Sequence, residues 1–113
     1  SVAAIYAVQL VPGAQGRIAT VNLRWQDPDT RQVEEISGTF GTDNLAASFD
    51  DAPLYHQLAV VVSQTAEILR ASYWADGVTW DDLRIRSERL AAQLDMPEVA
   101  EFAALVADAS RLQ

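Results

Sequence analysis

The fold class of the N-terminal half is indicated by the stretch Arg17-Ile-Ala-Thr-Val-Asn-Leu-Arg-Trp-Gln26, which is followed by Asp27-Pro-Asp-Thr30. Apolar and polar residues alternate along it, and the apolar face holds Ala19, Val21, Leu23 and Trp25. Period two with a polar opposite face is typical of a half-buried antiparallel strand. Proline and aspartate next favour a turn. The sequence therefore predicts a strand over residues 17–26 that enters a hairpin.

Two further strands are expected on either side of this one. Residues 2–10, Val-Ala-Ala-Ile-Tyr-Ala-Val-Gln-Leu, are apolar on both faces and stop at the turn signal Pro12-Gly13. Residues 32–40 form a weaker strand, in which Val33, Ile36 and Phe40 do not all lie on one face, so a bulge or a slipped register is expected there. Together these segments predict a three-stranded antiparallel sheet.

The chain changes character near residues 41–53, and helical periodicity follows. A first helix is expected over residues 52–72, with Asp50 or Asp51 as N-cap and Pro53 in its first turn. Its apolar residues cover most of the circumference, which predicts the buried centrepiece of the domain. Strands followed by helices indicate an α+β domain, a three-stranded sheet and then a three-helix unit, over residues 1–113 as one domain.

Two more helices are predicted from sequence patterns that are typical of a helix N-terminus. Thr79-Trp-Asp-Asp82 opens the second, with Thr79 as cap and an acid three residues later. Arg84 and Glu88 stand four residues apart on its polar side, a spacing that allows an ion pair. Asp95-Met-Pro-Glu98 gives the third helix the same kind of start, with Asp95 as cap.

Composition limits the classes of partner and chemistry. The 113 residues carry a formal charge of −8, which disfavours nucleic acid and anionic lipid as partners. Cysteine is absent, so there is no disulfide, thiol nucleophile or thiolate metal site. No apolar run approaches the ~20 residues that span a bilayer, so direct membrane insertion is not expected. The two-faced apolar segment at residues 2–10 needs cover on both sides, which suggests one module of a longer protein.

Two stretches taken together resemble a known bacterial family. They are Ala4–Leu10 with Val21–Asp29, and Leu54–Arg70 with Ser72-Tyr73, Gly77 and Thr79–Asp82. The pattern is similar to the C-terminal domain of von Willebrand factor type A (VWA) domain proteins, an uncharacterised region that follows the VWA domain. The similarity covers about residues 2–110, and it is loose over residues 32–50.

The resemblance implies an excised C-terminal module whose partners are the parent VWA domain and its N-terminal flanking segment. It also implies a cell-envelope or exported bacterial protein. The metal-binding Asp-Xaa-Ser-Xaa-Ser loop of VWA domains is absent from this sequence, so no metal ligand is carried over. No cofactor is expected in this chain.

Candidate catalytic and metal-binding residues have simpler explanations. Asp27 and Asp29 bracket a proline in a turn, without the further oxygen ligands that calcium needs. Asp81 and Asp82 are adjacent on a helix, about 100° apart, and fit a helix start better than a shared substrate. His56 is the single histidine and has no second histidine or cysteine with which to bind zinc. The sequence predicts no catalytic residue and no enzyme.

Apolar and aromatic residues are the candidates for an interface. One group lies in the first strand, and the other lies around the connection between the first two helices; they are Val2, Ile5 and Tyr6, and Tyr73, Trp74 and Trp80. The function expected is a non-catalytic accessory module that packs against other segments of its parent. The alternative is an autonomous protein-binding module that uses the aromatic patch Tyr73–Trp80. If strand one is left without cover, the isolated chain is expected to form a homodimer through it.

Overall fold

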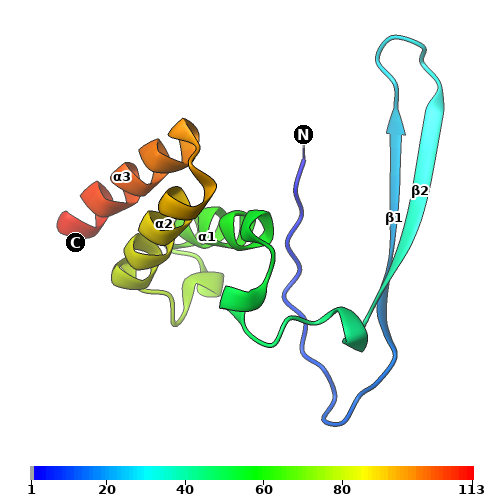
Figure 1. The fold of residues 1–113 in the computed structure, drawn as a ribbon, viewed down its shortest axis with the longest axis horizontal. Coiled ribbons are helices and arrows are strands. Elements are labelled where there is room, and N and C mark those ends of the chain that lie inside the picture. The colour runs from blue at the N-terminus through cyan, green and yellow to red at the C-terminus, as the bar shows by residue number, and fades with distance from the viewer. Residues whose placement is uncertain (1) are drawn as a thin grey trace. The chain divides into compact units, whose positions relative to one another are not determined.

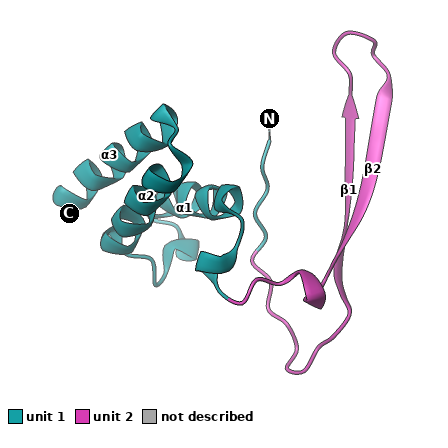
Figure 2. Ribbon diagram, in the orientation of Figure 1, with its two compact units in different colours: residues 1–6, 48–113 teal, residues 7–47 magenta. Residues whose placement is uncertain are grey.

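The computed structural model describes residues 2–113, whose contacts separate into two compact units (Figures 1 and 2). One unit is Ala7–Ala47, and the other is the chain up to Tyr6 together with Ser48–Gln113. The first holds strands β1 (Arg17–Gln26) and β2 (Val33–Gly41), followed by the short 3-10 turn η1 (Thr42–Asn44). The second holds the 3-10 turns η2 (Phe49–Asp51) and η3 (Tyr73–Ala75) and helices α1 (Leu54–Leu69), α2 (Trp80–Leu94) and α3 (Pro97–Arg111). Strands followed by three helices confirm the α+β class.

The sheet has two strands, and the prediction of a third is wrong. β1 and β2 form an antiparallel hairpin, whereas the predicted strand over residues 2–10 has no regular secondary structure. Within the described residues, no backbone hydrogen bond involves residues 2–10. A strand is stable only when a neighbour pairs with its N–H and C=O groups, and an apolar β-prone sequence does not supply that neighbour.

The register of the hairpin sorts its side chains into two faces. Leu23 lies opposite Ile36, and Ala19 lies opposite Phe40. Because residues directly opposite in an antiparallel pair share a face, these residues join Val21 and Trp25 on one side. The register shifts between Arg17 and Ala19, so the extra residue is in β1, and the expected irregularity in the second strand of the hairpin is absent.

The hairpin turn is held by one carboxylate. Asp27 Oδ1 accepts hydrogen bonds from the N–H groups of Asp29 at 2.9 Å and Thr30 at 2.7 Å. The Thr30 and Asp29 amides hold the pKa of Asp27 below its usual range, because they stabilise the ionised form. The turn expected at residues 27–30 is thus present, with its aspartates used as turn residues.

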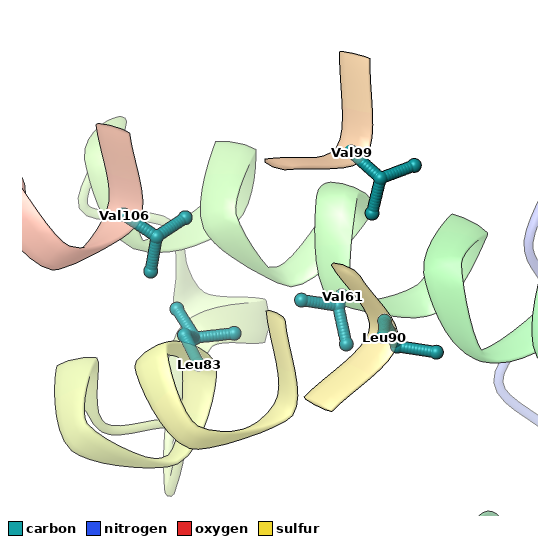
Figure 3. Packing of buried hydrophobic residues seen from close by; sticks show 5 residues of the cluster. All are labelled: Val61, Leu83, Leu90, Val99 and Val106. Carbon is teal, nitrogen blue, oxygen red and sulfur yellow. The ribbon is translucent and has the colours of Figure 1, made fainter. Parts of the chain in front are cut away.

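The hydrophobic core lies between the three helices. Its fully buried centre contains one residue of α1, two of α2 and two of α3, namely Val61, Leu83, Leu90, Val99 and Val106 (Figure 3). Burial of each such side chain contributes about 1.5–3 kcal/mol to folding, so this layer dominates the stability of the helical unit.

Helix α1 buries one face only, which corrects the prediction of an all-round buried centrepiece. Gln57, Val61 and Thr65 are buried, whereas Tyr55, Val62 and Leu69 are exposed. Apolar residues around most of a helix predict that other elements pack against it on all sides. Here α2 and α3 pack against one side of α1.

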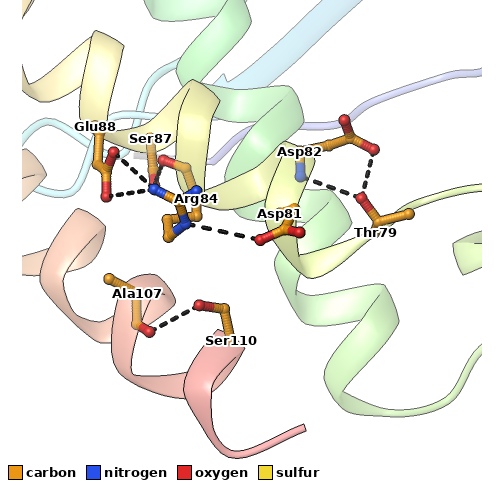
Figure 4. Close-up of polar contacts among 8 residues, drawn as sticks. All are labelled: Thr79, Asp81, Asp82, Arg84, Ser87, Glu88, Ala107 and Ser110. Carbon is orange, nitrogen blue, oxygen red and sulfur yellow. Dashed lines mark hydrogen bonds and ion pairs between the residues drawn. The ribbon is translucent and has the colours of Figure 1, made fainter.

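The helix starts agree with the sequence for α2 and differ for the other two. Thr79 Oγ1 accepts a hydrogen bond from the Asp82 N–H at 3.1 Å, as expected for the cap of α2 (Figure 4). Pro53, and neither Asp50 nor Asp51, occupies the N-cap position of α1. Met96 precedes α3, because Asp95 instead ends α2 in a left-handed conformation at φ 49°. Aspartate tolerates that conformation better than most residues.

A polar network fixes the start of α1 against α2. The buried Gln57 donates through Nε2 to the carbonyl of Ala52 at 2.8 Å and to that of Asp50 at 3.1 Å. Arg89 of α2 donates to Gln57 Oε1 at 3.1 Å and pairs with the Asp50 carboxylate at 2.7 Å. The hydrogen bond from Arg89 holds the pKa of Asp50 below its usual range.

Candidate functional site

One face of the hairpin is an exposed apolar surface. Each of its large apolar side chains is between 39% and 55% exposed; they are Val21, Leu23, Trp25, Ile36 and Phe40. These five residues are called the hairpin face below. Glu34, opposite Trp25, is a charged residue at the turn end of the same face. Contiguous exposed apolar surface of this kind marks a site of protein contact more often than it marks open solvent.

The opposite side of the same hairpin is polar except at Val33, which lies opposite Gln26 beside the turn. Thr20 lies opposite Thr39, Asn22 opposite Ser37 and Arg24 opposite Glu35. The two strands are therefore amphipathic, with one side suited to water and the other suited to a packed contact. An isolated two-stranded hairpin is marginally stable in water, so cover on its apolar side adds to its stability.

The residues predicted at the chain start lie at the surface. Val2 is 99% exposed, Tyr6 is also largely exposed, and Ile5 is half-exposed. Ala3 and Ile5 border an apolar groove of about 450 Å³ whose remaining lining comes from α1, at Tyr55, Leu58, Ala59, Val62 and Ser63. The structure therefore brings part of the predicted group to the exposed side of α1 and leaves Val2 in solvent.

The predicted aromatic patch divides into two parts. Tyr73 and Trp74 are 83% and 70% exposed and meet edge to face, with ring centroids 5.5 Å apart. Trp80 instead packs against the helical core. The interface candidates at this end of the molecule are thus Tyr73 and Trp74, and Trp80 is a core residue.

Local backbone geometry presents the two exposed aromatics. Helix α1 ends as Ala71 takes a left-handed conformation at φ 52°, and the Ser72 N–H donates to the Glu67 carbonyl at 3.0 Å. The Ser72 hydroxyl then accepts a hydrogen bond from the Trp74 N–H at 3.2 Å, which starts η3. The Ser72 hydroxyl and the Arg70 guanidinium hold the pKa of Glu67 below its usual range, so the end of α1 carries an anchored carboxylate.

The carboxylates considered for chemistry have structural partners. Asp82 Oδ2 accepts a hydrogen bond from the Thr79 hydroxyl at 2.6 Å, and Asp81 lies 3.8 Å from Arg84, which also pairs with Glu88 at 3.2 Å (Figure 4). The expected pair of Arg84 and Glu88 is confirmed. His56 is exposed on α1. Within residues 2–113, no three histidine, cysteine or acidic side chains gather as a metal-binding group would require.

Sequence reasoning missed two parts of the exposed apolar surface. Ile36 and Phe40 belong to the hairpin face, and their even spacing of four was the signal that places both on one side of a strand. The exposed side of α1 was missed because its apolar residues were assigned to the core. Their spacing of seven, at residues 55, 62 and 69, is two helical turns and marks a separate stripe.

Comparison of the chain with protein-family models, with curated proteins and with solved structures found no match. The longest helix of residues 2–113 has 16 residues, and none combines the length with the apolar character that a bilayer crossing requires.

Proposed function

We propose that the chain is a non-catalytic interaction module whose hairpin face packs against an apolar protein surface. The observation that carries this proposal is the amphipathic hairpin, in which five large apolar side chains share one side and remain at least 39% exposed. Aromatic and aliphatic side chains gathered in one patch are the usual anchors of protein interfaces.

The proposed partner is another segment of the same parent protein, a VWA domain with its flanking N-terminal segment. The support is the resemblance of residues 4–10 with 21–29, and of residues 54–70 with 72–73, 77 and 79–82, to the region that follows bacterial VWA domains. A contact within one parent also fits the chemistry of the hairpin face, because domains joined in one chain meet at high effective concentration and need little affinity. A gene that encodes no VWA domain beside this chain would overturn this choice of partner.

Trp25 provides a direct reporter for the hairpin contact. A variant with Trp74→Phe and Trp80→Phe leaves Trp25 as the single tryptophan, on the hairpin face near the turn. On titration with the VWA domain from the same gene, its fluorescence emission is expected to shift to shorter wavelength, because burial removes water from the ring.

Two variants on opposite faces of β1 make the test specific. Leu23→Asp places a charge in the hairpin face and is expected to weaken binding at least ten-fold. Asn22→Asp places the same charge at the adjacent position, on the polar side of the hairpin, and is expected to change the affinity by no more than about two-fold. Equal losses for both variants, or an unchanged Trp25 spectrum on binding, would count against the hairpin face.

A second candidate function uses Tyr73 and Trp74 as the recognition surface of an autonomous binding module. Their exposure of 83% and 70% favours it, since tyrosine and tryptophan are enriched among the residues that dominate binding energy. A chain with Trp74 as its single tryptophan should be quenched efficiently by acrylamide, and a bound protein should protect it. Loss of partner binding in Trp74→Ala, with Leu23→Asp binding normally, would select this surface over the hairpin face.

A further inference from the structure

The exposed stripe of α1 alternates large and small side chains. Tyr55, Val62 and Leu69 are between 44% and 66% exposed, and Ala59 and Ala66 lie between them on the same side. The stripe is separate from the core face of the helix, where Gln57, Val61 and Thr65 are buried. It is also distinct from the hairpin face, so the inference below stands independently of the proposed function.

The two halves of this stripe differ in shape. Its first half borders the groove of about 450 Å³, which has Tyr55, Ala59 and Val62 on one side and Ala3 and Ile5 of the chain start on the other. Its second half ends in the protruding side chain of Leu69, which is 66% exposed. The stripe thus has a recess at one end, which residues 3 and 5 help to form, and a projection at the other, about ten residues or 15 Å apart.

We propose that a second copy of this chain occupies the groove, through antiparallel packing of α1 on α1. A twofold axis near residue 64 places Leu69 of each copy over Ala59 of the other, and Val62 over Ala66. Both of these contacts pair a large side chain with a small one, and each pair occurs twice, as an isologous interface requires. Small residues at these positions let the two helix backbones approach closely.

Electrostatics favours this face over the other exposed helix surface. The chain carries a net charge of −8, so two copies repel unless they meet through an uncharged surface. None of the five stripe residues is ionisable as a carboxylate or a cation at neutral pH. On α3, by contrast, the exposed Leu105 and Leu112 alternate with Glu101 and Asp108 at spacings of three and four residues, so all four lie on one side of the helix. Two copies that met through this side would bring carboxylates together.

The contact is small, and its strength follows from its size. A single pair of 16-residue helices lies below the ~800 Å² per partner of a standard stable interface. The dimer is therefore weak and reversible. Its mass, measured by light scattering or sedimentation, should rise from monomer toward dimer between roughly 10 μM and 1 mM, the range in which small interfaces associate.

Two substitutions at residue 69 test the contact. Leu69→Glu is expected to weaken association at least ten-fold, because it places a carboxylate in the partner's apolar groove. Ile85→Glu, an equally solvent-facing aliphatic position on α2, is the matched control and should leave the association constant within about two-fold. Far-UV circular dichroism and the melting temperature confirm that each variant is folded.

Exchanging the large and the small residue of one contact pair tests which residues meet in the dimer, without introducing a charge. Leu69→Ala alone should weaken the dimer, and Leu69→Ala combined with Ala59→Leu should restore it, because the large side chain is returned to the same pair from the other copy. A chain that stays monomeric up to 1 mM overturns the proposal, as does a double variant that fails to restore association. Association that survives Leu69→Glu and is lost in Leu23→Asp also overturns it, since self-contact then runs through the hairpin face.

Discussion

Gln57 and Gln64 are two glutamines on α1 with opposite roles. The side chain of Gln57 is 1% exposed and makes three hydrogen bonds, to the carbonyls of Asp50 and Ala52 and from Arg89. Gln64 Oε1 is buried and has no hydrogen-bond partner among residues 2–113. A buried polar group that is satisfied resists replacement, whereas an unsatisfied one already carries a desolvation cost.

Substituting these residues should separate the two cases. Gln57→Leu is expected to lower the free energy of unfolding by roughly 1–3 kcal/mol, because the carbonyls of Asp50 and Ala52 lose their side-chain donor and Arg89 keeps only its ion pair with Asp50. Gln64→Leu is expected to be neutral or slightly stabilising. Urea unfolding followed by circular dichroism measures both. A loss at Gln64 as large as that at Gln57 would contradict this account of the network.

The ion pair of Asp50 and Arg89 makes stability depend on pH. Its carboxylate has a pKa below the usual range in the folded state, chiefly through the Arg89 hydrogen bond, so the pair stabilises the folded state above the unfolded-state pKa. That contribution is lost as pH falls through the lowered pKa. The difference in unfolding free energy between the natural chain and Asp50→Asn should therefore be present at pH 6–7 and shrink below about pH 4. A difference that stays constant down to pH 2.5 would show that the charge of Asp50 contributes nothing.

At the scale of elements, the hairpin and the helices differ in how they are supported. Within residues 2–113, β1 and β2 pair with no third strand, and every large apolar side chain of the hairpin face is at least 39% exposed. Helices α2 and α3 share a closed core with α1, where Leu83, Leu90 and Val106 are at most 2% exposed. Local stability follows the number of buried apolar contacts, so the hairpin belongs to the least stable part of the molecule.

Hydrogen exchange measures this difference directly. The bonded amides of β1 and β2 should exchange at least ten-fold faster, after correction for intrinsic rates, than those in the middle of α2. Binding of a partner to the hairpin face should slow the exchange in the strands and leave that in α2 unchanged. Equal protection of strands and helices in the isolated chain would mean that the hairpin is already covered.

The sequence indicates elements better than it indicates their neighbours. Strand β1 matches its predicted bounds because alternation over residues 17–26 is a local property. The predicted strand over residues 2–10 failed because pairing depends on a second chain segment, which no local pattern specifies. The same reason explains α1, since periodicity shows where Tyr55, Val62 and Leu69 point but not whether another element covers them. Thr79 was identified as a cap because capping involves only residues three positions apart.

At the scale of the molecule, two compact units share one short chain. Within the described residues, the buried core cluster comes from residues 48–113, and the hairpin belongs to the unit 7–47; the cluster contains Val61, Leu83, Leu90, Val99 and Val106. Folding of the helical unit therefore needs no side chain from the hairpin to complete its core.

A fragment of residues 48–113 should fold without the rest of the chain. We expect a cooperative thermal transition within about 5 °C of the helical transition of the full chain, since the buried core is retained. Differential scanning calorimetry and circular dichroism at 222 nm would record it. A fragment without a cooperative transition would show that residues before position 48, the chain start or the strands, contribute to the stability of the helical unit.

The extra residue in β1, Ile18, has a consequence for solubility. Hairpins with open edges stack edge to edge into fibrils when their strands are long and flat. The bulge at Ile18 bends β1 and increases its twist, which prevents a flat continuous edge near Arg17. Glu34 and Glu35 then bring like charges together whenever two copies of β2 stack in register. The hairpin can thus keep an open apolar face and still resist amyloid formation.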